Sequence, residues 1–126
     1  MRVILSIKPE FASKILDGTK KFEFRKCGFS MDGVATVVIY ATKPVGAVVG
    51  EFEIAEVHKD APRKIWAKTK LHAGVKKRFF DAYYADRQTA FAIAIGKVVK
   101  YDVPVALTSL GSGLTAPQSY RYLPAA

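Results

Sequence analysis

The sequence predicts a small α+β barrel, and three observations support this. The chain has 126 residues, 50% of them hydrophobic and 25% charged, which suits one domain over residues 1–126 with a sizeable core. Short runs rich in Val, Ile and Phe alternate with segments whose apolar residues recur at helical spacing. Their order along the chain, β-α-β-β-β-α-α-β, with short strands, is typical of a small α+β barrel.

The strands are predicted from short apolar or alternating runs. The five predicted strands are residues 2–7, 22–25, 34–41, 48–57 and 90–99. In the last of these, Phe91, Ile93 and Ile95 share one face and three alanines share the other, because side chains alternate along a strand. The small alanine side chains predict that a helix or a ligand approaches this face closely.

Three helices are predicted from apolar stripes and from residues typical of helix ends. Pro9 suits the first turn of the first helix, and Gly18 suits its C-terminal end. Pro62 signals the start of the second helix. Over residues 75–83, apolar side chains recur at every fourth position, as on a third helix. Residues 111–124 are predicted to be mostly irregular.

The charge distribution predicts a polyanionic partner. The formal net charge is +9 and the isoelectric point about 9.7. Residues 61–80 contain seven Lys and Arg residues and no Asp or Glu. Such a patch attracts nucleic acid, and Lys76, Lys77 and Arg78 are its densest part. The alternative is a basic surface that serves solubility alone.

The sequence predicts a cytoplasmic protein without a membrane segment. No apolar run approaches the roughly 18 residues that cross a bilayer. The first apolar run ends at Lys8 and Pro9, which is too early for a secretion signal. A single cysteine, Cys27, excludes an internal disulfide and fits a reducing compartment. The oligomeric state is not predicted.

Common catalytic motifs are absent from the sequence. It contains no phosphate-binding glycine loop and no G-x-S-x-G elbow. His58 and His72 are fourteen residues apart, with one cysteine elsewhere, which is poor spacing for metal ligands. A nucleophilic pair of Cys27 with a histidine stays open, although a single cysteine is more often structural. We therefore expect no metal and no cofactor.

The segment GTKKFEFRK, residues 18–26, is the most informative stretch. On a strand, Phe22 and Phe24 lie on one face, with Glu23 and Arg25 on the other. The charged face is either solvated surface, where an ion pair contributes little, or the lining of a polar pocket. Alternation alone puts Lys21, not Lys20, on the charged face.

The same segment fits the pattern G-x-K-x-x-E-x-R and resembles the signature of the ASCH domain, a branch of the PUA-like superfamily. The segments SIKPEFASKILDG, IYATKPVGAVVGEFEI and TAPQSYRYL are similar to the same family and occur in the same order. The resemblance covers nearly the whole chain. It implies a PUA-like β-barrel flanked by helices, with a cleft beside the signature.

The resemblance also implies an activity. ASCH proteins are associated with RNA, and some small bacterial members are amidohydrolases that remove the acetyl group from N4-acetylcytidine. The lysine that those enzymes use falls on Lys20. They have a threonine where this chain has Glu23, and they use a glutamate from a later helix, whereas residues 61–80 contain no acid.

We accordingly expect a nucleobase-recognising amidohydrolase whose substrate is a modified nucleoside or RNA. Lys20 would activate water, Glu23 would transfer a proton and Arg25 would stabilise the oxyanion. The residues expected to bind substrate are Lys8, Tyr40, Thr42, Gln118 and Ser119. The alternative is an RNA-binding module without catalysis, and a third possibility is a ribonuclease.

Overall fold

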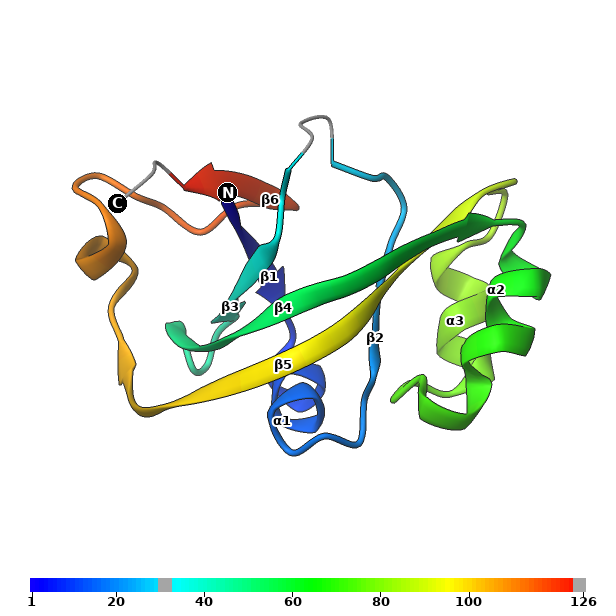
Figure 1. The fold of residues 1–126 in the computed structure, drawn as a ribbon, viewed down its shortest axis with the longest axis horizontal. Helices are drawn as coiled ribbons and strands as arrows, with labels where there is room; N and C mark the ends of the chain where they lie inside the picture. The colour runs from blue at the N-terminus through cyan, green and yellow to red at the C-terminus, as the bar shows by residue number, and fades with distance from the viewer. Residues whose placement is uncertain (30–32, 124–126) are drawn as a thin grey trace.

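The computed structural model describes residues 1–29 and 33–123, and its central feature is a curled six-stranded sheet that forms half of a barrel (Figure 1). The elements in chain order are β1 (Arg2–Ile7), α1 (Pro9–Leu16), β2 (Phe22–Arg25), β3 (Thr36–Ala41), β4 (Ala47–Asp60), α2 (Pro62–Thr69), α3 (Lys77–Tyr83), β5 (Ala90–Val105) and β6 (Tyr120–Leu123). Two single-turn 3₁₀ helices cover Lys70–His72 and Leu107–Leu110. The predicted α+β fold with a barrel-like sheet and flanking helices is confirmed.

The sheet has the strand order β2-β5-β4-β3-β1-β6. β1 and β3 are parallel neighbours whose connection contains α1 and β2, and the other pairs are antiparallel. β4 and β5 form the longest pair, and register shifts near Ile54 interrupt their ladder. Such bulges increase the local twist and allow a sheet to curl. β2 and β6 are left as its two edges.

Two of the predicted strands are longer in the structure, and one strand was missed. β4 extends from the predicted 48–57 to Ala47–Asp60, and β5 extends from 90–99 to Ala90–Val105. The prediction that residues 111–124 are mostly irregular is wrong for β6, which pairs with β1 from Arg2 opposite Leu123 onwards. A segment of four residues is too short to show a strand-like alternation of apolar and polar residues. This strand therefore forms because it can pair with β1, at the other end of the chain.

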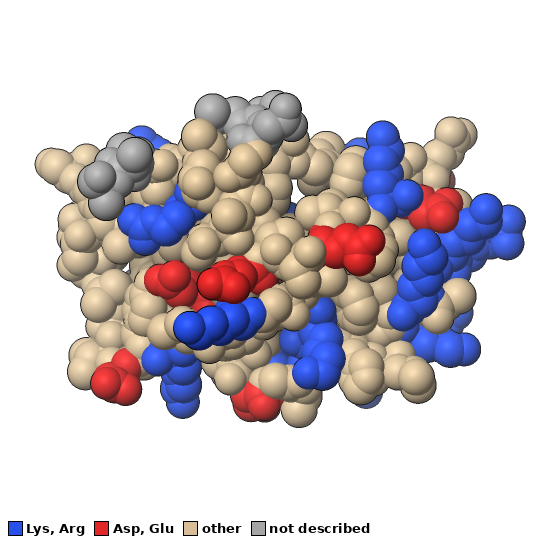
Figure 2. Space-filling model, in the orientation of Figure 1, with Lys and Arg blue, Asp and Glu red and all other residues tan. Residues whose placement is uncertain are grey.

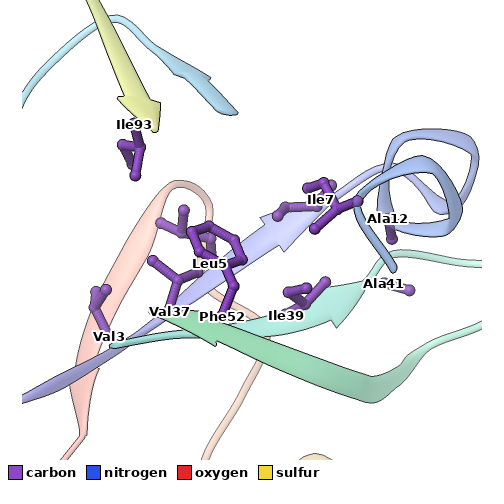
Figure 3. Packing of buried hydrophobic residues seen from close by; sticks show 10 residues of the cluster. Val3, Leu5, Ile7, Ala12, Val37, Ile39, Ala41, Phe52 and Ile93 are labelled. Atoms are coloured by element: carbon purple, nitrogen blue, oxygen red, sulfur yellow. The ribbon is translucent and has the colours of Figure 1, made fainter. Parts of the chain in front are cut away.

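The main hydrophobic core lies between the sheet and α1. Alternate residues of β1 and β3 point into it, together with Phe52 from β4, Ile93 from β5 and Ala12 from α1 (Figure 3). Ile15 of the same helix is fully buried there. The apolar stripe of α1 therefore places that helix against the sheet.

A second core holds α2 and α3 against one end of the sheet, where Figure 1 shows the two helices side by side. Ala90 and Ala92 of β5 pack in this core with Ile65 of α2 and Phe80 of α3. The alanine face thus admits helices, as its small side chains predict. The Tyr84 hydroxyl, just after α3, has one hydrogen to donate, which the backbone carbonyls of the paired residues Arg25 and Phe91 share at 2.9 and 3.1 Å.

Basic side chains gather at the same end of the molecule. Among the charged side chains that Figure 2 shows on the right of the view, over α2 and α3, most are Lys and Arg. In the described parts of the chain, residues 1–29 and 33–123, no helix is long and apolar enough to span a membrane.

Candidate functional site

A cleft of about 160 Å³ lies where β1, α1, β2 and α3 meet. The residues that line it are Ser6, Ile7, Lys8, Phe11, Lys20, Glu23, Phe24, Arg25, Val75, Phe79 and Tyr83. A buried apolar cavity of about 150 Å³ accepts a benzene molecule. The cleft is therefore large enough for one aromatic ring and too small for two stacked bases.

The turn after α1 directs Lys20 into this cleft. Gly18 has φ of +86°, a left-handed conformation that ends the helix. The backbone N–H groups of Thr19 and Lys20 then both donate to the carbonyl of Lys14 at 3.0 Å. Lys20 is 1% exposed, whereas Lys21 is exposed and precedes the regular part of β2. Strand alternation therefore does not apply to Lys20, which lies in the turn.

The Lys20 ammonium has one carbonyl and two aromatic faces around it. Nζ donates a hydrogen bond to the carbonyl of Ala73 at 2.7 Å. It lies 4.7 Å from the ring centroid of Phe24 and 5.4 Å from that of Phe11. Burial lowers the pKa of Lys20 to about 8, although Glu23 opposes the shift and Lys14 adds to it. A larger fraction of this amine is therefore neutral at pH 7 than for an exposed lysine.

Three consecutive carbonyls hold the turn that carries Lys20. Besides Ala73, the carbonyl of His72 accepts from the Lys21 N–H at 2.9 Å, and that of Gly74 accepts from Lys14 Nζ at 3.3 Å. Gly74 has φ of +69°, and a Cβ built on it would lie 2.5 Å from both Cβ and Cγ of Lys20. Residues 72–74 thus fit directly against the lysine stem, which only a glycine permits.

Glu23 brings a second titratable group into the cleft. The side chain is buried on β2, and burial raises the pKa of its carboxyl, although the charges of Lys20 and Arg25 oppose that shift. Nη1 of Arg25 lies 3.3 Å from Oε2 of Glu23. A carboxyl with raised pKa beside an amine with lowered pKa is typical of an acid–base pair.

Arg25 connects the two edges of the half-barrel. Its Nη2 donates to Oγ of Ser119 at 2.7 Å and to the Ser119 carbonyl at 3.0 Å. Ser119 directly precedes β6, and Arg25 is the last residue of β2, so this contact joins the edge strands. Nearby, the Ser6 hydroxyl donates to the Pro117 carbonyl at 2.6 Å. The C-terminal segment therefore fixes the guanidinium beside Glu23.

Aromatic side chains of α3 form the outer wall of the cleft. Phe79 and Tyr83 are stacked, with ring centroids 6.3 Å apart and planes 9° apart. Lys8 Nζ lies 5.1 Å from the Phe79 centroid, and Lys26 Nζ lies 4.8 Å from that of Tyr83. These rings were predicted as a helix stripe rather than as site residues. An aromatic pair four residues apart in a basic segment was the available signal.

The structure does not bring every expected residue to this cleft. Tyr40 packs in a separate core cluster with Ile4 and Val38, and neither Thr42 nor Gln118 lines the cleft. Ser119 reaches the site only through Arg25.

The predicted basic patch also divides. Lys76 and Arg78 line a neighbouring groove, whereas Lys77 pairs with Asp81 at 2.7 Å on its own helix. Among residues 1–29 and 33–123, no group of three or more His, Cys, Asp or Glu side chains is placed to hold a metal.

Known proteins resemble this chain in sequence and in fold. The model of the ASCH domain matches residues 5–99. Large ribosomal subunit protein uL22 of Ureaplasma parvum is 29% identical over 121 residues, which cover 96% of this chain and 39% of that protein. The chain therefore spans about two fifths of the length of that curated relative.

Two further likenesses come from Zymomonas mobilis. An ASCH domain-containing ribonuclease is 25% identical over 122 residues, covering 95% of this chain and 82% of that protein. The crystal structure of an ASCH protein superposes with a TM-score of 0.88 at 24% identity, covering 98% of this chain and 87% of that one. That structure supports the fold.

Proposed function

This chain belongs to the ASCH domain family, and from that premise we propose that it is a hydrolase that recognises a nucleobase. The proposed reaction removes an acyl group from the exocyclic amine of cytidine or a related nucleoside. The observation that carries the proposal is the meeting of Lys20, Glu23 and Arg25 in one cleft of single-ring size. A solvated surface has no need for this combination of burial and opposed pKa shifts.

The cleft suits a pyrimidine ring with a small acyl substituent. Phe11, Phe24 and Phe79 supply apolar contact. The charged groups Glu23 and Arg25 come from β2, and Lys20 comes from the turn that precedes it. A pocket of this kind binds by its apolar walls and orients its ligand through few polar groups. A cleft of about 160 Å³ can enclose a single base but not a larger substrate.

In the proposed reaction, neutral Lys20 takes a proton from water while the water oxygen attacks the amide carbonyl. The oxyanion of the tetrahedral intermediate is stabilised by the guanidinium of Arg25. The protonated carboxyl of Glu23 then donates its proton to the exocyclic nitrogen, the C–N bond breaks, and a carboxylic acid and a free amine leave. Proton transfer from the Lys20 ammonium to the Glu23 carboxylate restores the starting state.

A second candidate activity is cleavage of RNA, favoured by the Zymomonas mobilis relative that is named a ribonuclease. The same groups provide the chemistry. One of Lys20 and Glu23 would remove the 2′-hydroxyl proton, and the other would protonate the leaving 5′-oxygen. Arg25 would stabilise the negative charge on the non-bridging oxygens of the phosphate. The products would be a 2′,3′-cyclic phosphate and a free 5′-hydroxyl.

Incubation with N4-acetylcytidine and, in parallel, with end-labelled RNA separates these activities. Acetate release without RNA cleavage supports the amidohydrolase, and RNA cleavage alone supports the ribonuclease. Binding of RNA without either product would leave a non-catalytic RNA-binding module and would overturn the proposal.

The matched variants are Lys20→Met and Lys21→Met. Met keeps most of the buried stem volume and removes the amine, so Lys20→Met should reduce kcat about 10²-fold or more, as loss of an acid–base group does. Lys21 is exposed and lines no part of the cleft, so its variant should retain activity. Full activity in Lys20→Met would remove this residue from the mechanism.

A further inference from the structure

A basic groove between α1 and α3 continues directly from the cleft. It has a volume of about 420 Å³ and shares Phe11, Val75 and Phe79 with the cleft. We call it the α1–α3 groove, and its charged lining residues are Glu10, Lys14, Lys76 and Arg78. Three cations against one carboxylate give the groove a positive charge, which attracts anions.

The position of Lys14 links the two hollows. Its Nζ donates to the carbonyl of Gly74 at 3.3 Å, next to the Ala73 carbonyl that holds Lys20. The Lys14 charge helps to lower the pKa of Lys20, so the two ammonium groups interact electrostatically. An anion in the α1–α3 groove would therefore lie close to the reacting end of the cleft.

The aromatic wall between the hollows favours a nucleotide chain. Phe79 borders both hollows and is 37% exposed, with Phe11 edge-on to it at 5.1 Å between ring centroids. Exposed rings beside basic side chains are the usual means of binding single-stranded nucleic acid, because bases stack on the rings while cations contact phosphates.

We infer that the α1–α3 groove binds the phosphate next to the base held in the cleft. The substrate is then a nucleotide within single-stranded RNA rather than a free nucleoside. This inference rests on the proposed function, because it extends the same site. The RNA must be single-stranded at this position, because a cleft the size of one ring accepts only a base that is unpaired and no longer stacked on its neighbours.

The structure also separates the consecutive basic residues that the sequence groups together. Lys76 and Arg78 line the α1–α3 groove, whereas Lys77 lies between them in sequence and pairs with Asp81 four residues later. Lys77 is therefore a matched control on the same short segment. Its side chain has the same formal charge as those of its two neighbours, but it pairs with Asp81 and does not line the groove.

The test compares a Lys76→Ala, Arg78→Ala double variant with Lys77→Ala. The probes are a short single-stranded RNA carrying one N4-acetylcytidine and the free N4-acetylcytidine nucleoside. The double variant should bind the RNA about tenfold more weakly at low salt. Loss of two phosphate contacts should reduce the slope of log K against log salt by about 1.4, at roughly 0.7 per contact on a single strand. Lys77→Ala should bind within about twofold of the wild type.

The kinetic comparison distinguishes this inference from the proposed function. Wild-type kcat/KM should be higher on the acetylated RNA than on the nucleoside, and the double variant should lose most of that preference. The inference that the α1–α3 groove binds phosphate would be refuted by equal RNA affinity in the double variant and in Lys77→Ala. A wild type that prefers the nucleoside would refute it as well. If RNA binding depends on Lys76 and Arg78 but neither probe is turned over, phosphate binding by the α1–α3 groove is supported and the proposed hydrolase activity is refuted.

Discussion

Gly74→Ala should slow the proposed reaction by moving Lys20, although Gly74 lines the α1–α3 groove and not the cleft. The added Cβ would lie 2.5 Å from Cβ and Cγ of Lys20 and 2.8 Å from its Cδ. These atoms belong to the rigid beginning of the side chain, so a change of the terminal rotamer does not relieve the contact. Lys20 and its turn must move by about 1 Å to restore ordinary van der Waals separation.

A displacement of that size has a large expected effect on the reaction. Misplacement of a reacting group by about 1 Å can cost about 10²-fold in rate. The same movement lengthens the 2.7 Å hydrogen bond from Lys20 Nζ to the Ala73 carbonyl. We therefore expect kcat on the preferred substrate to fall by about 10 to 100-fold, with a smaller change in KM.

Gly113→Ala is the matched control for backbone strain. Gly113 has φ of +74°, close to the +69° of Gly74, and a Cβ built there meets nothing within 4 Å. Both variants should lose roughly 1–2 kcal/mol because alanine disfavours the left-handed conformation, and Gly74→Ala should lose somewhat more through overpacking. Thermal unfolding and steady-state kinetics are measured on both. If Gly74→Ala is as active as Gly113→Ala, contact with residues 72–74 does not position the amine.

Two further predictions concern stability. Tyr84→Phe removes the single donor that the carbonyls of Arg25 and Phe91 share, so the free energy of unfolding in urea should fall by about 1–2 kcal/mol; an unchanged midpoint would show that those carbonyls find water instead. Burial lowers the pKa of Lys20 from 10.5 to about 8, so between those values the unfolded chain binds more protons at this residue than the folded chain. Stability of the wild type should therefore rise with pH relative to Lys20→Met over that window, and parallel pH profiles of the two melting temperatures would contradict the lowered pKa.

The sequence by itself determined most of the secondary structure. Apolar periodicity identified β1, the α1 stripe and the order of the longer elements, because those patterns are local and side-chain direction repeats every two or every 3.6 residues. The G-x-K-x-x-E-x-R pattern likewise identified the family, which the domain model confirms. The pattern also marked Lys20, Glu23 and Arg25, whose roles stay proposals.

Contacts between distant parts of the chain were not available from such patterns. β6 forms because β1 offers it an edge, and Ser119 reaches Arg25 across 94 positions of sequence. The aromatic wall of the cleft comes from α3, which the second core places beside β2. Nothing in the local sequence around these residues encodes their neighbours.

The motif marked Lys20, but only the tertiary structure explains why this lysine and its neighbour have different surroundings. Lys20 and Lys21 are adjacent and chemically identical, yet one is buried against Phe24 and the other is exposed, because the turn after α1 ends between them. Lys77 and its neighbours on either side diverge in the same way. Sequence determines the charge of a side chain, but its direction and its pKa depend on burial and on neighbours that only the folded chain brings together.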